Sequence, residues 1–395
     1  MQSAVDDMKS GGQPTNGYMT VDMMRFLAAL TVVWNHAWNL FAPSSEAVAG
    51  PWLSVYRSAG FGPDAVRVFF VISGYWITAS IMRKAEAGSW TWGSYLIDRL
   101  SRLWIVLVPV LIIGLLLDVS ARFLFAFPRY ADFDFIGLHN YDLADRLTPQ
   151  AFLGNLVFLQ NIVVEPFGSN LPLWSLANEF WYYIWFPAFY LVFRRKVSVM
   201  TLLSVVTLIL FIHTNVAEGF PIWLLGSLVY VVTQHTGGKL HAAPAVPRYG
   251  AVAIALAAFL ATLAYTHLSP ISWLVDGLIE GVGFSLLLAA VIAFNVGIPK
   301  LLSPLAIYGA QASFSLYLLH FPVLLFAASL LTGGRVFAPG PEALAMALGM
   351  SAFLVAAAWA FSRVTEKHTG WMRRRLTSLL LRPRAPAAKR DGASA

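Results

Sequence analysis

The sequence contains no cysteine among its 395 residues, and charged residues make up only 12% of it. The lack of cysteine excludes disulfide bonds, thiolate nucleophiles and thiolate metal sites. Soluble domains usually contain about twice this share of charged residues. The composition therefore argues against a soluble protein, and any chemistry must come from histidine, carboxylates, hydroxyls and arginine.

Excess charge of one sign is also missing from most of the chain. The formal net charge is +7, but the segment from residue 363 onward holds nine Lys and Arg against Glu366 and Asp391, so the rest of the chain sums to zero. This basic tail directly follows an apolar run. Its position indicates a topology signal and contact with anionic lipids rather than nucleic-acid binding.

Long apolar runs are present instead. Hydrophobic residues make up 58% of the chain, and runs of about 20 of them recur along it. We predict an all-α, polytopic helical membrane protein with about ten transmembrane helices. The expected spans lie at about 22–41, 64–82, 96–117, 172–193, 198–213, 219–234, 250–268, 273–295, 303–331 and 343–362.

Basic residues next to these spans predict the topology. The clusters Arg83-Lys84 and Arg194-Arg195-Lys196 follow spans two and four, and the charges at Lys239, Arg248 and Lys300 fall on the same side when both termini are cytoplasmic. The apolar run at 151–164 is too short to cross and is predicted to be re-entrant or interfacial. We divide the chain into a cytoplasmic arm (1–20), a membrane domain (21–368) and a basic cytoplasmic tail (369–395).

Charged and polar residues inside the first span suggest a site. Arg25 and His36 are eleven residues apart, which places them on one helix face about 16 Å apart, and Asp22 joins that face. A charged side chain inside a bilayer costs about 2 to 4 kcal/mol and usually serves a site. The alternative is that Arg25 extends to the headgroups and His36 bonds a neighbouring helix.

Two arginines on the third span face the same side of the membrane as Arg25. Arg99 and Arg102 are three residues apart and share a helix face. Because guanidinium groups bind phosphate oxygens in a fork geometry, the three arginines are candidates for a phosphate site at the inner surface. Ordinary positive-inside anchoring is the alternative.

Spans four and nine contribute further polar residues. Ser175 and Glu179 are i,i+4 neighbours in span four, and a carboxylate at this depth needs a partner or a wet cavity. In span nine, Ser313, Tyr317 and His320 recur on one face. Such residues line a cavity between helices or bond the helices to one another.

Other polar or aromatic residues give weaker signals. Ser73 precedes Gly74 without a nucleophile-elbow pattern, so close helix packing explains it better than nucleophilic catalysis. The aromatic and acidic stretch 118–173, with Trp174 at its edge, is a candidate acceptor wall. The remaining histidines have no acidic companions at ligand spacing, so no metal site is expected; they are His139, His213, His235, His241, His267 and His368.

Five motifs in this order resemble the membrane acyltransferase-3 family of bacterial enzymes that O-acylate, most often O-acetylate, glycans, lipid-linked sugars and some small molecules. They are Asp22-x-x-Arg25 with His36, Phe69-Phe70-Val71-Ile72-Ser73-Gly74-Tyr75, Arg99-Leu100-Ser101-Arg102, Trp174-Ser175-Leu176-x-x-Glu179, and Ser313-x-Ser315-Leu316-Tyr317-Leu318-x-His320-x-Pro322. The resemblance extends from about 18 to 368. Arg67, Asp98 and the late Pro109 depart from the family pattern.

The resemblance implies a stand-alone O-acyltransferase of the bacterial inner membrane, without a fused hydrolase-like domain. It implies acetyl-CoA or another acyl-CoA as the donor substrate, no permanently bound cofactor, and a glycan or lipid-linked sugar as acceptor. The implied activity is polysaccharide modification by O-acetylation. His36 and Glu179 would be catalytic, and Arg25, Arg99 and Arg102 would bind the donor. Glu366 matches a family carboxylate.

Substrate-binding residues are then expected at Ser73, Trp174, Ser175, Tyr317 and His320. Within the reaction, His36 would act as general base on the acceptor hydroxyl, with Glu179 orienting the imidazole, or would form an acyl-histidine intermediate. Two other functions stay open: a transporter or translocase of a lipid-linked saccharide, and acylation of a small molecule such as a macrolide.

Overall fold

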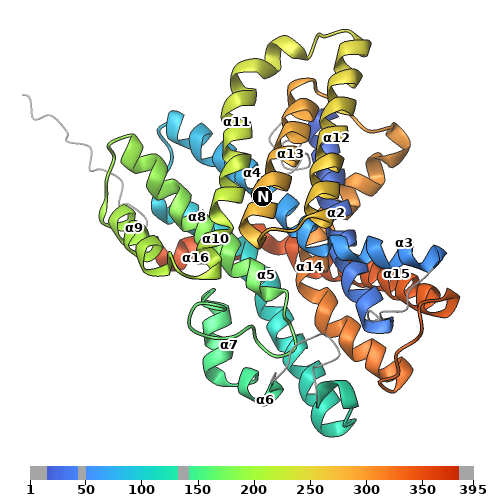
Figure 1. Cartoon of the computed structure of the whole chain (residues 1–395). Helices are drawn as coiled ribbons and strands as arrows, with labels where there is room; N and C mark the ends of the chain where they lie inside the picture. Colours follow the sequence, from blue (N-terminus) through green and yellow to red (C-terminus); the bar gives the residue numbers. More distant parts are fainter. Residues whose placement is uncertain (1–15, 43–49, 132–141, 382–395) are drawn as a thin grey trace, which may run out of the picture.

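The computed structural model describes residues 16–42, 50–131 and 142–381, and within this part the chain is helical (Figure 1). The long helices, in chain order, are α2 (Asn16–Phe41), α4 (Gly62–Glu86), α5 (Trp92–Val119), α8 (Leu173–Phe193), α11 (Phe220–Leu240), α12 (Ala245–Leu268), α13 (Trp273–Ala293), α14 (Ser303–Thr332) and α15 (Pro341–Val364). The shorter helices are α3 (Pro51–Ser58), α6 (Leu143–Arg146), α7 (Pro149–Leu156), α9 (Val199–Phe211), α10 (Asn215–Glu218) and α16 (Thr369–Leu380).

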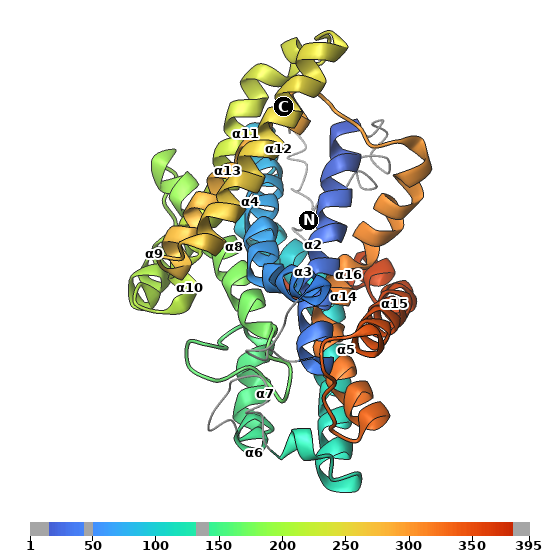
Figure 2. The same ribbon diagram turned by 45° about the vertical axis from the view of Figure 1, so that its right-hand side comes forward.

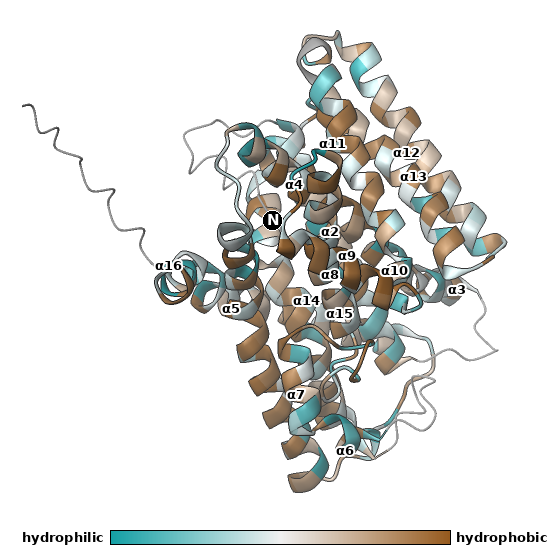
Figure 3. Cartoon of the chain, turned by 90° about the vertical axis from the view of Figure 1, so that its left-hand side faces the viewer, coloured by the Kyte–Doolittle hydropathy of each residue, from teal (hydrophilic) through white to brown (hydrophobic). Residues whose placement is uncertain are grey.

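The predicted all-α membrane architecture is confirmed. Among the described residues, seven segments are helical, long and apolar enough to cross a membrane, and they hold α4, α5, α11, α12, α13, α14 and α15. Helices α2 and α8 have the necessary length but contain the polar and aromatic residues of the predicted site. The protein is thus a multi-pass membrane protein. Figure 3 shows apolar residues along the long helices and hydrophilic residues around α6 and α16.

The expected span at 198–213 is shorter in the structure. Helix α9 has 13 residues and therefore rises only about 20 Å, less than the hydrocarbon thickness of about 30 Å. Turns and the four-residue helix α10 follow it before α11 begins. The count of ten crossings therefore depends on α9.

The run at 151–164 does not continue as a helix. Helix α7 ends at Leu156, the chain turns, and Val164 packs back against Gly154. Indole groups of α5 and α8 hold this turn: Trp104 donates to the Leu156 carbonyl and Trp181 to the Phe158 carbonyl, each at 2.9 Å. The segment thus forms a short helix and a folded-back loop beside the bundle.

Helices lie on both sides of the predicted boundaries of the membrane domain. Helix α2 begins at Asn16, inside the predicted arm, whereas residues 1–15 lie outside the described part. The first twelve residues of the predicted tail form α16, which packs along α5 and pairs Arg373 with Asp98 at 3.1 Å. Residues 382–395 lie outside the described part, as do 132–141 of the predicted outer segment.

Helix α2 occupies the centre of the packing. It lies along α14 and α4, and α14 also packs on α15 and α5. Helix α11 joins α4 to α13, and α13 joins α12 (Figure 2). Helices α11, α12 and α13 therefore stand together on one side, and α6 and α7 lie at the opposite end of the molecule.

One close helix contact explains the Ser73-Gly74 pair. A Cβ at Gly74 would lie 2.0 Å from the Trp223 carbonyl oxygen, and a Cβ at Gly226 would lie 1.9 Å from that of Val71. Only glycine allows α4 and α11 to approach this closely. The predicted close helix packing is confirmed at Gly74.

Candidate functional site

A narrow cavity of about 50 Å³ lies where α2, α4, α5, α8 and α14 meet. Its polar lining includes six residues that the sequence analysis singled out, and they come from four of these helices. The lining residues are Arg25, Val66, Phe69, Phe70, Arg102, Leu103, Ser175, Leu176, Glu179, Tyr183, Ser313, Phe314 and Tyr317. The structure therefore brings Arg25, Arg102, Ser175, Glu179 and Tyr317 to one place.

Arg25 carries unused hydrogen-bond donors in this cavity. Its Nη2 donates to the Ala310 carbonyl at 3.0 Å and lies 3.1 Å from Asp22, and the side chain is 3% exposed. Its Nε and Nη1 are buried and have no hydrogen-bond partner within the described part of the chain. Since an unpaired buried donor costs about 1–3 kcal/mol, this guanidinium is prepared for a carbonyl or anionic ligand.

The two arginines of α5 have different surroundings. Arg102 lines the cavity. Arg99 instead lies over aromatic rings, 5.6 Å from the ring centre of Tyr95 and 6.0 Å from that of Tyr183. Arg99 thus contacts a lining residue but is not itself part of the lining.

Glu366 belongs to the arginine end of the site. Its Oε1 accepts from the Ser315 backbone N–H at 3.1 Å and from the Ser315 hydroxyl at 2.7 Å. Arg102 and Arg25 both attract its charge. The carboxylate in η6 (Glu366–His368) therefore ties the end of α15 to α14 beside Arg25 and Arg102.

Glu179 is satisfied by neighbouring hydroxyls. Ser73 Oγ donates to Glu179 Oε1 at 3.1 Å, and Tyr183, one turn further along α8, donates to the same oxygen. Tyr183 was not predicted, although its i,i+4 spacing from Glu179 was visible in the sequence. Ser73 is thus a hydrogen-bond donor to the carboxylate.

His36 has a different partner from the one expected. Its Nδ1 lies 2.9 Å from His320 Nε2, and the two rings stack with centres 5.0 Å apart. Among the described residues, the hydrogen bonds of Glu179 go to Ser73 and Tyr183 and not to His36, and the prediction that Glu179 orients or charge-stabilises His36 stays a prediction. His36 is also not a lining residue of the cavity; Tyr317 connects them, because its ring lines the cavity and its backbone bonds to His320.

The hydrogen bonds of His320 determine which nitrogens carry protons when both rings are neutral. His320 Nδ1 lies 2.7 Å from the Tyr317 carbonyl and 3.2 Å from that of Leu316. Carbonyl oxygens only accept, so Nδ1 is the protonated nitrogen of His320 and its Nε2 accepts from His36 Nδ1–H. His36 Nε2 is then left with a lone pair and is a base.

Two prolines free backbone carbonyls that polar side chains of the site region then bind. Pro322 lacks the N–H that would bond the Leu318 carbonyl, and Asn170 Nδ2 donates to this carbonyl at 2.9 Å. Pro187 likewise frees the Tyr183 carbonyl, which accepts from the Tyr95 hydroxyl at 3.0 Å. These bonds fix the helices that carry His320 and Glu179.

Ser175 and Trp174 take separate roles. The Ser175 hydroxyl bonds the Tyr317 hydroxyl inside the cavity. Trp174 is not among the lining residues and packs edge-on against Phe70 and Trp273, at 6.4 and 6.2 Å between ring centres. Trp174 thus supports the cavity from behind.

The stretch 118–173 contributes no described residue to this cavity. Asp118 instead accepts from the Ser169 N–H at 2.7 Å and its hydroxyl at 2.6 Å, which fixes the loop before α8 to α5. In η3 (Pro128–Tyr130), Arg129 donates to the Arg335 carbonyl at 2.8 Å, and burial lowers the pKa of its guanidinium to about 10. The described part of this stretch therefore does not line this cavity, and its role as an acceptor wall stays a prediction.

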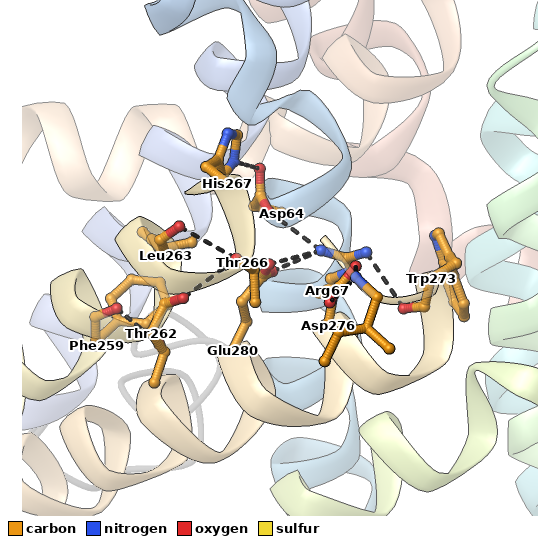
Figure 4. Close-up of polar contacts among 11 residues, drawn as sticks. Asp64, Arg67, Phe259, Thr262, Leu263, Thr266, His267, Trp273, Asp276 and Glu280 are labelled. Atoms are coloured by element: carbon orange, nitrogen blue, oxygen red, sulfur yellow. Dashed lines mark hydrogen bonds and ion pairs between the residues drawn. The ribbon is translucent and has the colours of Figure 1, made fainter. Parts of the chain in front are cut away.

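A second polar cluster, which the sequence did not reveal, connects α4, α12 and α13 (Figure 4). Arg67 Nη1 bonds both oxygens of Glu280, at 2.8 and 2.7 Å, and lies 3.1 Å from Asp64. His267 Nε2 lies 3.1 Å from the other Asp64 oxygen. His267 thus has an acidic partner that the search at ligand spacing could not find, because the two residues are 203 positions apart in the sequence.

Within the described ranges, no group of three or more metal-ligating side chains occurs.

The chain matches the acyltransferase-3 family, described as an acyltransferase domain, over residues 20–363. No curated protein and no solved structure matches it. The family match covers most of the chain and includes every residue that lines the cavity, so the protein belongs to the membrane acyltransferase-3 family and is an acyltransferase.

Proposed function

We propose that this enzyme transfers an acetyl group from cytoplasmic acetyl-CoA to a hydroxyl of a cell-surface glycan or lipid-linked sugar. The bacterial inner membrane would hold the protein with both termini in the cytoplasm. The same chemistry would serve a longer acyl-CoA. Acetyl-CoA is a substrate in this proposal and not a resident cofactor.

The observation that carries the proposal is the hydrogen-bond chain that ends at His36. Backbone carbonyls fix the tautomer of His320, and His320 fixes that of His36. The imidazole of His36 is thereby oriented with Nε2 as a base, which is the requirement for activating a hydroxyl. Here a neutral histidine takes the orienting place that a carboxylate often occupies.

The arginines suit the charged part of the donor. Arg102 and Arg25 line the cavity, and Arg25 has two unused donors. Phosphates of the donor would bind at the arginine end, and the pantetheine arm would follow α2 toward His36. The spacing of eleven residues along an unbroken helix corresponds to about 16 Å.

In the direct reaction, the acceptor O–H gives its proton to His36 Nε2 while its oxygen attacks the thioester carbonyl. The C–S bond breaks, and the thiolate leaves and takes up the proton as free CoA. In the alternative order, Nε2 attacks first and forms an acyl-histidine, which the acceptor hydroxyl then cleaves. Both orders need the same nitrogen unprotonated.

The test is CoA release by the pure protein in detergent, with acetyl-CoA and a purified glycan as acceptor. We expect His36→Ala to lower kcat at least 100-fold, since a positioned general base contributes about 10²–10⁴ in rate. Arg102→Ala should mainly raise KM for acetyl-CoA. The matched control is His213→Ala, an exposed histidine after α9, which should keep wild-type kcat.

Two results would contradict the proposal. Wild-type turnover by His36→Ala would exclude the base, and an unchanged KM for acetyl-CoA in Arg102→Ala would exclude the phosphate site. A translocase would move a saccharide across vesicles without releasing CoA. The assay therefore separates the acyltransferase reaction from that alternative.

A further inference from the structure

A second, larger cavity of about 610 Å³ opens between α2, α3, η1 (Ala59–Phe61) and the C-terminal end of α12. Its size falls in the range of about 300–1,000 Å³ that ligand sites occupy. The lining residues are Asn35, Asn39, Tyr56, Arg57, Ala59, Gly60, Phe61, Leu260, Leu263, Ala264, His267 and Leu268. None of them lines the cavity that holds Glu179.

The lining combines hydrogen-bonding groups with ring faces. Asn39 makes no hydrogen bond within the described part of the chain, so its amide can both donate and accept. Tyr56 and Phe61 add aromatic surfaces, and Arg57 is the charged group, with no carboxylate among the described lining residues. Amides that bond hydroxyls, beside apolar ring faces, suit a sugar ring that is neutral or acidic.

His267 is held at the cavity by the polar cluster of α4 and α13 (Figure 4). The Asp64 carboxylate accepts from His267 Nε2–H, so in the neutral ring Nδ1 has the lone pair and can accept from a hydroxyl. Asp64 is held in turn by Arg67, which Glu280 also binds. Phe61 packs against the imidazole at 4.5 Å between ring centres.

This cluster is costly to bury. Arg67 is 7% exposed and Glu280 2%, and desolvating such charges costs several kcal/mol per ion. Buried ion pairs therefore contribute little net stability. Here the outcome of the arrangement is a fixed imidazole on the wall of an open cavity.

The cavity adjoins His36 along α2. Asn35 and Asn39 are four residues apart on α2, so their side chains are neighbours on the helix surface. Asn39 also lies three residues after His36, so these two side chains are neighbours as well. Asn35 is itself fixed, because its amide donates to the Ala59 carbonyl and Gly62 packs on its side chain. A molecule bound in the cavity would lie beside the catalytic helix face.

We infer that this cavity binds the acceptor as a glycosyl unit, with Asn39 and His267 bonding its hydroxyls and Tyr56 or Phe61 packing on its ring. The assignment of the bound sugar as the acyl acceptor rests on the proposed function. Binding itself is independent of acyl transfer. It assigns the acceptor to the α2–α3–α12 cavity and not to the stretch 118–173.

The experiment measures sugar binding to the full chain in lipid nanodiscs by saturation-transfer difference NMR, without donor. The probes are methyl glycosides of glucose, galactose, mannose, N-acetylglucosamine and glucuronic acid, with cyclohexanol as the apolar control. We expect at least one glycoside to bind at millimolar concentration. His267→Ala and the cavity-filling Ala264→Trp should each weaken this binding at least fivefold.

The matched control is Ala257→Trp, two turns away on the same face of α12 and exposed like Ala264 but outside the cavity. It should bind sugar as the wild type does. The inference is overturned when no glycoside binds the wild type, or when Ala264→Trp binds as well as Ala257→Trp. Because the donor is absent from this experiment, sugar binding can be found even if acyl transfer fails. Acyl transfer can likewise be found even if no sugar binds in this cavity.

Discussion

The two ring nitrogens of His36 have unequal surroundings, because Nδ1 lies 2.9 Å from a neutral neighbour, His320. His320 is fully buried and is fixed by carbonyls of its own helix. It can accept a hydrogen bond from His36 without bringing a charge into the membrane. A carboxylate in this place would be expensive to bury, since carboxylates within spans need partners of their own.

We therefore expect substitution of His320 to lower kcat without weakening donor binding. His320→Ala should lower kcat about 10- to 100-fold, the loss seen when the orienting partner of a functional imidazole is removed from metal sites. His320→Gln should recover part of this loss, because its amide oxygen can accept from His36 Nδ1–H. Steady-state CoA release, with kcat and KM for acetyl-CoA separated, measures both variants.

A purely structural role of His320 would give another pattern. His320→Ala would then lose folded protein, while the remaining folded fraction kept wild-type kcat, and glutamine would give no rescue. Size-exclusion chromatography of each variant supplies the folded fraction. Such a result would remove His320 from the mechanism.

At the residue scale, the sequence predicted many members of the site but few of their partners. Arg25, Arg102, Ser175, Glu179 and Tyr317 were predicted from depth and motif, and they line one cavity. The contact between His36 and His320 joins residues 284 positions apart, and helical spacing carries no information on contacts between helices.

At the scale of elements, hydropathy predicted the long helices well because most of the predicted spans are continuous helices. It was less informative for α9, whose apolar run extends beyond the 13 residues that are helical. It also gave no indication of α16, which is polar and is held by packing on α5 and by the pair Arg373–Asp98. Short or polar helices depend on tertiary contacts that a window average does not contain.

The crossing of α4 and α11 gives a prediction at this scale. Gly226→Ala places a methyl group against the Val71 carbonyl, which cannot move without moving α4. We expect a loss of about 1–3 kcal/mol in stability, the usual cost of overpacking a filled interface. Thermal unfolding in detergent should show a lower Tm.

The matched control is Gly250→Ala in α12, where an added Cβ would meet no atom within 4 Å. This change should leave Tm unchanged or raise it, since alanine is favoured over glycine in helices by about 0.5–1 kcal/mol. Equal Tm values for the two variants would mean that α4 and α11 separate easily.

At the scale of the whole molecule, the topology depends on the crossing number of the segment that holds α9. The absence of cysteine makes this directly measurable, because a single introduced thiol is the only target for maleimide. With both termini in the cytoplasm, Ala242→Cys between α11 and α12 lies inside, and Ser269→Cys after α12 lies outside. Both positions are exposed.

A membrane-impermeant maleimide should therefore label Ser269→Cys but not Ala242→Cys in intact spheroplasts, and both after permeabilisation. The unmodified chain, which has no thiol, is the control. Labelling of Ala242→Cys in intact spheroplasts would mean that α11, α12 and α13 cross the membrane in the orientation opposite to the predicted one. It would also place the α2–α3–α12 cavity on the side opposite to that proposed for the acceptor.

Helix α2 finally limits how this gene can change over time. Because α2 runs unbroken from Asn16 to Phe41, a single codon inserted between Arg25 and His36 would turn His36 by about 100° and carry it off His320. Substitutions at outward-facing positions such as Leu27 leave that register intact. This stretch can thus change at outward-facing positions but not in its length.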